Sequence, residues 1–307
     1  MPRINNPVSP IVSKLEGLHL FHFDGAPCAQ RVRFALGEKG LKRGREVRFD
    51  ASDPASSKGE PGRWVSRKVS LVKKHHMTET YAQIHPDMVV PALVHDGSLY
   101  LESMDIIEYL DSVFPGPQLI PQNSAQHEQV LALVEEAKVL HLSIRYVTFH
   151  WGLGRLAMLS AKERDKLNEL AAAGSDGENL VSFYAAYSTR TIAMEVFEDH
   201  LARLYRAFER LDGEMKDGRK YLAGDEFSIA DIFWSMKVLR LLETGYPLAE
   251  QHPLLARWYE GVRSRPAFQH EVMENNRLSN RLFTLKSGIE NLAGIGLKSA
   301  IHKLALA

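Results

Sequence analysis

Residues 89–103 have the sequence Val89-Val90-Pro91-Ala92-Leu93-Val94-His95-Asp96-Gly97-Ser98-Leu99-Tyr100-Leu101-Glu102-Ser103. The apolar runs on both sides of Asp96-Gly97 predict a β-hairpin, because these two residue types readily take the φ angles that a tight turn requires. A helix is expected from Met104 to Phe114, with Ser103 as its N-cap. The amides at such a helix start bind anions, so a ligand carboxylate can lie at Ser103 while Glu102 accepts an ammonium group. This stretch therefore predicts a site for an amino-acid head group. The helix is expected to bury a stripe formed by Ile106, Ile107, Leu110 and Val113.

The composition limits the class of protein. The chain has 307 residues, of which 45% are hydrophobic, so it suits two modest domains with real cores. Lys+Arg and Asp+Glu both number 38, and this balance predicts no nucleic-acid partner. Cys28 is the single cysteine, which excludes an internal disulfide and a cysteine-built zinc site. We expect no metal site, no export signal or membrane span, and a reducing, cytoplasmic compartment.

The N-terminal third predicts an α+β domain. Residues 1–16 are expected to form an irregular arm, followed by a strand at 18–23, a helix at 31–39 and a strand at 47–49. Together with the hairpin and its helix, these elements predict a thioredoxin-like domain over residues 17–115. The segment at about 51–74 is rich in Lys and Arg, and it predicts a basic insertion. This insertion is either a solvated surface loop or a loop that attracts an anionic ligand.

The rest of the chain predicts helices. A Pro- and Gly-containing linker at 115–121 precedes an expected all-α domain at 122–275, with helical periodicity over 123–151 and 197–215. Ser228 and Asp231 are spaced as a reciprocal cap of the next helix. Residues 276–307 predict a basic amphipathic tail that packs on the body of the protein, caps the active site or touches a membrane surface. Its apolar residues are Ile289, Leu292, Ile301 and Leu304.

Cys28 is expected in the first turn of the first predicted helix. There the positive end of the helix dipole and Arg31 both favour the thiolate form. One interpretation makes Cys28 a nucleophile or a resolving thiol. The other makes it a small apolar residue packed under the turn.

Several of these segments resemble the glutathione transferase superfamily, over about residues 18–272. The resemblance implies a thioredoxin-like N-terminal domain with a cis Val90-Pro91 bond, followed by an all-α C-terminal domain. It also implies that glutathione is the cosubstrate, that Val90, Pro91, Glu102 and Ser103 bind it, and that the protein is a homodimer. Several classes of the family carry a catalytic Ser or Cys where this chain has Ala26, whereas Cys28 matches the disulfide-forming cysteine of other groups. The segments that carry the resemblance are Val90-Pro91, Glu102-Ser103, Ala26 to Leu36, Leu222 to Asp231, and Pro253 to Phe268.

Within the superfamily, residues 146–150 and 227–234 look most like the tetrachlorohydroquinone reductive dehalogenases, with the bacterial lignin β-etherases as plausible relatives. This likeness implies a glutathione S-transferase that acts in aromatic compound degradation, with an attack by the glutathione thiolate on an electrophilic aromatic substrate. The alternatives are a non-catalytic glutathione-binding or regulatory protein, which Ala26 suggests, and a glutathione-dependent isomerase. The candidate substrate-pocket residues are Tyr146, Phe149, His150 and Trp151. Aromatic residues at helical spacing are also typical of ordinary helix packing.

Overall fold

The computed structural model describes residues 3–4, 7–152, 154, 158–171 and 177–305. The chain forms two compact units, one from residues 1–117 with 157–191 and the other from residues 118–156 with 192–307. Both units bury apolar side chains of their own, and among the residues described the β-strands all lie in the N-terminal unit. In the described part of the chain, no helix is long and apolar enough to cross a membrane.

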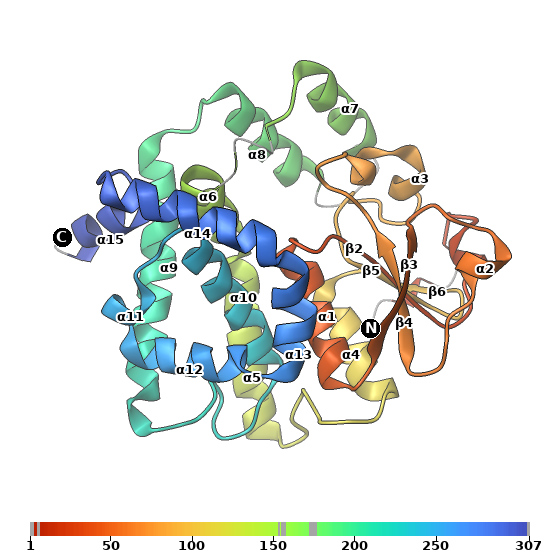
Figure 1. The fold of residues 1–307 in the computed structure, drawn as a ribbon, viewed down its shortest axis with the longest axis horizontal. Coiled ribbons are helices and arrows are strands. Elements are labelled where there is room, and N and C mark those ends of the chain that lie inside the picture. The colour runs from red at the N-terminus through yellow and green to blue at the C-terminus, as the bar shows by residue number, and fades with distance from the viewer. Residues whose placement is uncertain (1–2, 5–6, 153, 155–157, 172–176, 306–307) are drawn as a thin grey trace. The chain divides into compact units, whose positions relative to one another are not determined.

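The N-terminal unit is built on one mixed sheet of six strands in the order β1-β6-β5-β2-β4-β3 (Figure 1). Strands β2, β4 and β3 run parallel to one another, and the pairs β2–β5, β5–β6 and β6–β1 are antiparallel. The strands are β1 (Arg3–Ile4), β2 (Leu18–His22), β3 (Lys42–Arg48), β4 (Arg63–Lys68), β5 (Ala92–His95) and β6 (Ser98–Tyr100). This arrangement is thioredoxin-like, as the sequence predicts.

Helices pack on this sheet and on one another. The helix α1 contacts α4, while α7 and α8 form a small core with the segment around η2 and α3 through Met77, Met88, Leu159 and Leu167. The helices of the unit are α1 (Pro27–Glu38), α2 (Pro54–Ser57), α3 (Glu79–Ala82), α4 (Ser103–Val113), α7 (Ala161–Ala171) and α8 (Gly177–Thr189). The unit also contains two 3-10 turns, η1 (Val12–Lys14) and η2 (His75–Met77).

The predicted hairpin is confirmed. Strands β5 and β6 are joined by Asp96 and Gly97, whose φ angles are 47° and 72°. These positive angles are those of a type I′ turn, which matches the twist of the two strands. The predicted cap of α4 is wrong, because Glu102 is the N-cap and Ser103 is the first helical residue. Val113 was also expected to be buried but is 49% exposed, because it lies in the last turn of α4.

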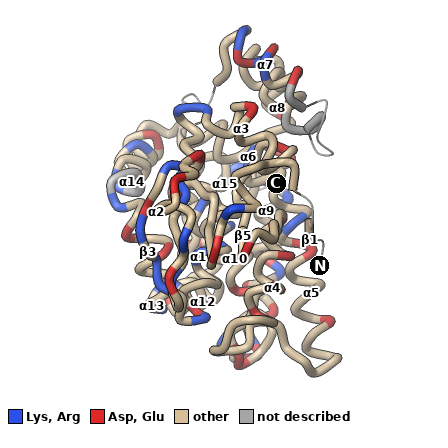
Figure 2. Tube along the Cα trace, turned by 90° about the vertical axis from the view of Figure 1, so that its right-hand side faces the viewer, with Lys and Arg blue, Asp and Glu red and all other residues tan. Residues whose placement is uncertain are grey.

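The largest difference from the sequence prediction lies in the expected basic insertion. The segment contains β4, which lies between β2 and β3 in the sheet. Its residues Trp64 to Arg67 are buried, so most of this strand is interior and not a solvated loop. Lys and Arg are frequent along β3, at the edge of the sheet (Figure 2). The N-terminal segment is also less irregular than expected, since β1 pairs with β6.

The C-terminal unit is all-α. The helix α10 is buried along most of its length and contacts α5, α6, α12 and α14. The principal helices are α5 (Ser124–Val139), α6 (His141–Trp151), α9 (Met194–Glu214), α10 (Ile229–Glu243), α12 (Pro253–Arg263), α14 (Arg277–Leu292) and α15 (Leu297–Ala305). Shorter elements are η4 (Met215–Asp217), α11 (Leu248–Gln251), α13 (Pro266–Phe268), η5 (Gln269–Met273) and η6 (Glu274–Asn276).

The predicted cap of α10 is confirmed. Ser228 and Asp231 form a capping box, and the Asp231 carboxylate also accepts hydrogen bonds from the Leu222 amide at 3.0 Å and from Trp258 Nε1 at 2.8 Å. Burial raises the pKa of Asp231. The C-terminal tail forms two helices that contact α9 and α10. Ile301 is buried, whereas Ile289 and Leu292 are exposed.

Candidate active site

The strand register brings the predicted glutathione-site residues to one edge of the sheet. Phe21 is paired with Ala92, so Pro91 lies beside His22, the last residue of β2, just before the chain turns into α1. Leu93 is paired with Tyr100, so Glu102 leaves β6 at the same edge. Because all of these elements belong to one unit, the edge is a coherent candidate site. It gathers Cys28, Val90, Pro91, Glu102 and Ser103.

The peptide bond between Val90 and Pro91 is cis, as the family resemblance implies. Val90 is 7% exposed. The preceding carbonyl, that of Val89, accepts a hydrogen bond from Tyr81 Oη at 2.7 Å. The backbone that leads into β5 is therefore fixed from the side of α3.

Glu102 and Ser103 have different environments. Glu102 is exposed, has a φ of 34° and makes no side-chain hydrogen bond as the cap of α4. Ser103 is buried, and its hydroxyl accepts a hydrogen bond from Arg31 Nη1 at 3.3 Å. Arg31 is 3% exposed and belongs to α1, so a buried guanidinium joins α1 to α4. The sequence prediction gave Arg31 a role toward Cys28 and missed its contact with Ser103, which depends on the packing of two helices that are distant along the chain.

Cys28 is the second residue of α1 and is half-buried. Pro27 occupies the first helical position, where a missing N–H costs little. Ala26 precedes it and supplies no side-chain hydrogen bond to the helix. A sulfur atom at this helix start would therefore meet backbone amides, the helix dipole and Cys28, but no hydroxyl from position 26.

The turn before Cys28 is held by a buried arginine that sequence analysis missed. Arg33, fully buried on α1, donates to the carbonyl of Phe23 at 3.3 Å and to the carbonyl of Asp24 at 3.0 Å. The Asp24 carboxylate pairs with Arg43 at 3.5 Å and with Lys68. Burial, together with these cations, holds the pKa of His22 well below its ordinary value. The turn is thus fixed by groups on α1, β3 and β4.

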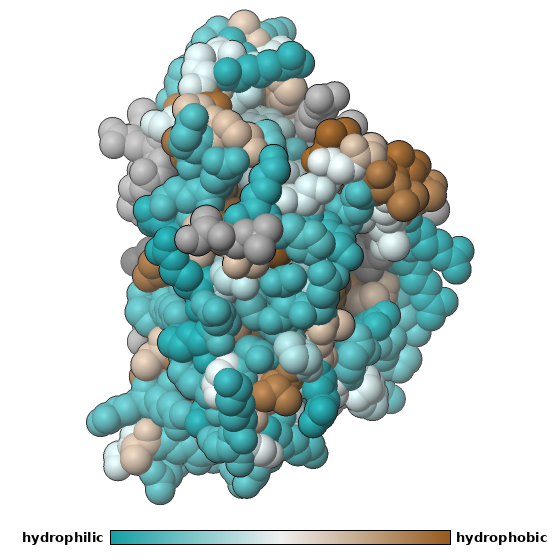
Figure 3. Space-filling view, turned by 90° about the vertical axis from the view of Figure 1, so that its left-hand side faces the viewer, coloured by the Kyte–Doolittle hydropathy of each residue, from teal (hydrophilic) through white to brown (hydrophobic). Residues whose placement is uncertain are grey.

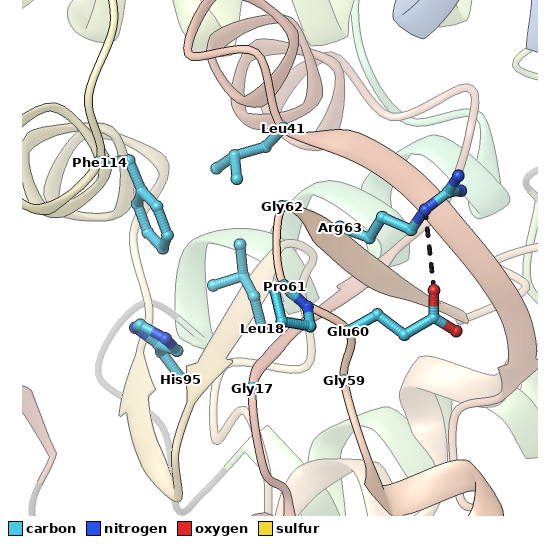
Figure 4. Close-up of a pocket in the computed structure, with 10 residues that line it drawn as sticks. All are labelled: Gly17, Leu18, Leu41, Gly59, Glu60, Pro61, Gly62, Arg63, His95 and Phe114. Atoms are coloured by element: carbon cyan, nitrogen blue, oxygen red, sulfur yellow. Dashed lines mark ion pairs between the residues drawn. The ribbon is translucent and has the colours of Figure 1, made fainter.

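A small cavity of about 210 Å³ lies at the opposite end of β2 (Figure 4). Leu18 and His95, which line it, are register partners at the N-terminal end of β2, away from the edge that carries Cys28. Phe114 and an ion pair between Glu60 and Arg63 form other parts of its wall. This cavity is therefore separate from the candidate glutathione site.

The four predicted substrate residues are on α6, in the C-terminal unit. Tyr146 stacks on His200 of α9 at 4.1 Å between ring centroids, and His150 lies 4.4 Å from the ring of Phe197 on the same helix. Trp151 is 6% exposed. Phe149 is partly exposed. Tyr146 and His150 thus contribute to the packing of α6 on α9.

His75 and His76 are adjacent in η2, and histidine is a common metal ligand. His75 accepts a hydrogen bond from the Ser70 amide at 3.2 Å, and burial lowers the pKa of His76 to about 4. Within the residues that the structure describes, no cluster of three or more His, Cys, Asp or Glu side chains is arranged to hold a metal ion.

Comparison with known families agrees with this geometry. The family model "Glutathione S-transferase, N-terminal domain" matches residues 20–118, and the model "Glutathione S-transferase, C-terminal domain" matches residues 181–266. Together they cover more than half of the chain. The chain belongs to the glutathione S-transferase superfamily, whose cosubstrate is glutathione.

Individual relatives span nearly the whole chain. Glutathione S-transferase 1 of Dianthus caryophyllus is 27% identical over 90% of this chain and 99% of its own length. Glutathione S-transferase TCHQD of Arabidopsis thaliana is 24% identical over 83% of this chain and 89% of its own length. Among solved structures, the beta-etherase LigF from Sphingobium sp. strain SYK-6 has the same fold, with a TM-score of 0.67 and 22% identity over 83% of this chain and 98% of that chain.

Proposed function

We propose that this protein is a glutathione-dependent enzyme in which the glutathione thiolate attacks an electrophilic aromatic substrate, by β-aryl ether cleavage or by dehalogenation. One observation carries the proposal: the cis Val90-Pro91 bond, Glu102-Ser103 and the start of α1 lie together at one edge of the sheet. The choice of aromatic chemistry is supported by the likeness to proteins named beta-etherase and TCHQD.

The cysteinyl and γ-glutamyl parts of glutathione each have a chemical partner at this edge. The backbone of Val90 pairs with the cysteinyl part, as an added strand would. Glu102 accepts the ammonium group of the γ-glutamyl end, while Ser103 and the start of α4 hold its carboxylate. Arg31 donates to the Ser103 hydroxyl and adds a positive charge beside the bound carboxylate. We therefore assign Arg31 to the positioning of Ser103.

In the proposed reaction, the thiol of glutathione gives its proton to solvent water, and the resulting thiolate sulfur is stabilised by the amides at the start of α1. The sulfur then attacks the aromatic substrate at the carbon that carries the leaving group. A carbon–sulfur bond forms, and the carbon–oxygen or carbon–halogen bond breaks. Its electron pair leaves with the aryloxide or halide ion.

Cys28 supports a second, reductive step. Its thiolate attacks the sulfur of an S-glutathionyl aromatic product, so a disulfide forms between Cys28 and glutathione. The electron pair of the broken carbon–sulfur bond passes to the aromatic carbon, which takes a proton from water. A second glutathione thiolate then releases Cys28 and leaves as glutathione disulfide. Cys28 is half-buried and not enclosed in the core, which supports this exchange.

We propose that the aromatic substrate binds against Tyr146, Phe149, His150 and Trp151 of α6. Phe149 is partly exposed and His150 is exposed, so both offer ring surface to a ligand. Packing against Phe197 desolvates part of the His150 ring and lowers its pKa, which favours the neutral form for contact with an aromatic ring. We further propose a homodimer in a reducing, cytoplasmic compartment, which suits the single cysteine.

One observation favours a second candidate function. Ala26 supplies no hydroxyl at the start of α1, where several classes of the family carry a Ser or Cys. A protein that binds glutathione without activating its thiol is therefore the alternative.

Turnover of a β-aryl ether and of a chlorinated hydroquinone, with glutathione binding measured in parallel, tests the proposal. We expect glutathione to be bound and consumed. We expect Cys28→Ala to retain ether cleavage but to accumulate the S-glutathionyl hydroquinone. Binding without turnover of either substrate would favour the non-catalytic protein, and turnover without consumption of glutathione would indicate an isomerase.

A Glu102→Gln variant should weaken glutathione binding, and unchanged binding would contradict the assigned site.

A further inference from the structure

The helix α14 is attached to the protein by its polar face. Ser287 is 5% exposed, and Asn291 Nδ2 donates to the Gly245 carbonyl at 3.2 Å. A Cβ atom at Gly245 would lie 2.7 Å from Asn291 Nδ2 and 2.9 Å from Ser287 Cβ, so the helix sits directly on bare backbone. This close approach fixes which side of α14 faces the body.

The apolar side of α14 faces solvent instead. Its large aliphatic residues are spaced by three, four and three positions, which places them in one stripe along the helix. Figure 3 shows the left-hand side of Figure 1, the side toward which the C-terminal end of α14 runs. Apolar surface gathers at the upper right of this view. This apolar stripe consists of Leu282 (54% exposed), Leu285 (63%), Ile289 (60%) and Leu292 (92%). Soluble helices normally bury such a stripe, so it requires a partner.

Arginines border this stripe on one side. A groove of about 490 Å³ is lined by Arg263, Arg277 and Arg281 together with Leu285 and two further residues. Arg263 pairs with Glu260 at 3.3 Å and Arg277 with Glu274 at 3.4 Å, both as exposed pairs. Arg281 is exposed and has no ion-pair partner among the residues described. The partner of the stripe must therefore accept guanidinium groups as well as aliphatic side chains.

We propose that α14 binds flat on an anionic lipid membrane surface. The apolar stripe enters the boundary between headgroups and acyl chains, and Arg277 and Arg281 contact lipid phosphates at its edge. A 16-residue helix with a buried polar face is too short and too polar to span a bilayer, but its length suits the membrane interface. Arg281, which has no ion-pair partner among the residues described, leaves a positive charge at the edge of the apolar stripe, and this charge favours an anionic lipid surface as the partner.

Co-sedimentation of the full chain with vesicles tests this inference. We expect binding to vesicles of phosphatidylglycerol and phosphatidylcholine, and binding at least tenfold weaker to vesicles of phosphatidylcholine alone. The double variant Leu285→Gln/Ile289→Gln should lose binding to both kinds of vesicle by tenfold or more. The double variant Arg277→Gln/Arg281→Gln should lose about tenfold on the anionic vesicles only, and this loss should shrink at high salt.

Two matched substitutions provide controls. Val139→Gln removes an exposed aliphatic residue on α5 (70% exposed), and Arg257→Gln removes an exposed charge on α12. Both should bind vesicles like the wild type, and all variants should keep the wild-type circular dichroism spectrum, because the changed side chains are exposed. Wild-type protein that fails to bind anionic vesicles at low salt, or stripe variants that bind as wild type, would overturn the inference. A dimer in solution that Leu285→Gln/Ile289→Gln dissociates, without vesicle binding, would instead make the stripe an interface between copies.

Discussion

Arg67 in the N-terminal unit and Asp231 in the C-terminal unit are both fully buried charges that are held by neutral groups. Arg67 donates to the carbonyls of Phe49, Ala51 and Ser56 and to His19 Nδ1, at distances from 2.7 to 3.2 Å. Asp231 accepts from amides, a hydroxyl and an indole at 2.8 to 3.2 Å. The pair teaches that a buried ionisable group is tolerated when neutral groups fill its hydrogen-bonding capacity.

The two charges differ in how far their partners lie along the chain. Ser228 is three residues from Asp231, so a capping box is visible in the sequence. The partners of Arg67 are 11 to 48 residues away, so nothing local marks it as buried. In structural terms, Arg67 ties the crossover between β3 and β4 to the sheet, whereas Asp231 ties α10 to α12.

The largest effect is expected for Asp231→Ala. The variant leaves the amides of Leu222 and Ser228 and the indole N–H of Trp258 buried without their acceptor. We expect a loss of about 3–5 kcal/mol in the free energy of unfolding, measured by urea denaturation. Hydrogen exchange should show the loss in the helical unit first. A loss below about 1 kcal/mol would mean that the carboxylate is not the junction of α10 and α12.

The second-largest effect is expected for Arg67→Met, a loss of about 2–3 kcal/mol in the free energy of unfolding. Three carbonyls lose their donor, but the methionine side chain fills much of the vacated volume and still covers Phe21, whose ring centroid lies 5.4 Å from the guanidinium carbon. The crossover at residues 49–57 should become more sensitive to proteolysis. Arg63→Met, on the same strand but 49% exposed, is the matched control and should stay near wild-type stability. Equal losses in the two variants would contradict the buried role of Arg67.

Acid should lower the stability of the protein through His19, whose Nδ1 accepts a hydrogen bond from Arg67. Burial lowers the pKa of His19 from 6.5 to about 4. Between these values the unfolded chain binds a proton that the folded chain does not, so the free energy of unfolding falls as pH falls below 6.5. From pH 7 to pH 5 we expect His19 to contribute a loss of about 2 kcal/mol. Asp231 acts in the opposite sense at lower pH, because its raised pKa favours proton uptake by the folded state.

Urea denaturation at pH 7, 6 and 5 measures this dependence. His19→Gln should be less stable at pH 7 but should show a shallower fall between pH 7 and pH 5 than the wild type. If both proteins show the same slope, His19 is not the group that titrates.

The smallest effect is expected for Ser228→Ala, about 1 kcal/mol, which is typical for the loss of one side chain of a helix cap. Asp231 keeps its bonds from Leu222 and Trp258 in this variant. The melting temperature of this variant therefore separates the contribution of the Ser228 cap from that of the other hydrogen bonds of Asp231. A loss of stability as large as that of Asp231→Ala would mean that the two contributions cannot be separated.

The distinction between partners that are near and partners that are distant along the chain also explains which features the sequence could predict. The hairpin at Asp96-Gly97, the helix α4 and the capping box rest on residues within a few positions of one another, and all are present in the structure. The sequence does not reveal the strand β4, because its basic residues suggest exposure to solvent. Only the backbone carbonyls that contact Arg67 in the folded protein show that its side chain points inward. Likewise the inverted orientation of α14 depends on close packing against Gly245, which periodicity alone cannot reveal.

The candidate site follows the same pattern. The cis bond at Pro91 and the pair at Glu102-Ser103 were predicted from family resemblance, and the strand register brings them to one edge. The buried Arg31 beside Ser103 and the Arg33 that holds the turn before Cys28 were not assigned these contacts. Arg31 and Ser103 are 72 positions apart, and Arg33 reaches back nine positions to a backbone carbonyl, a contact that no side-chain pattern in the sequence marks.

The central claim is that this edge of the sheet binds glutathione and activates its thiol. An ultraviolet titration of the thiolate of bound glutathione tests it most directly, in the wild type and in Cys28→Ala. We predict that the pKa of the bound thiol lies well below that of free glutathione in both proteins, because the amides at the start of α1 stabilise the sulfur. A bound thiol that titrates like free glutathione in both proteins would contradict the account and leave a protein that binds glutathione without activating it.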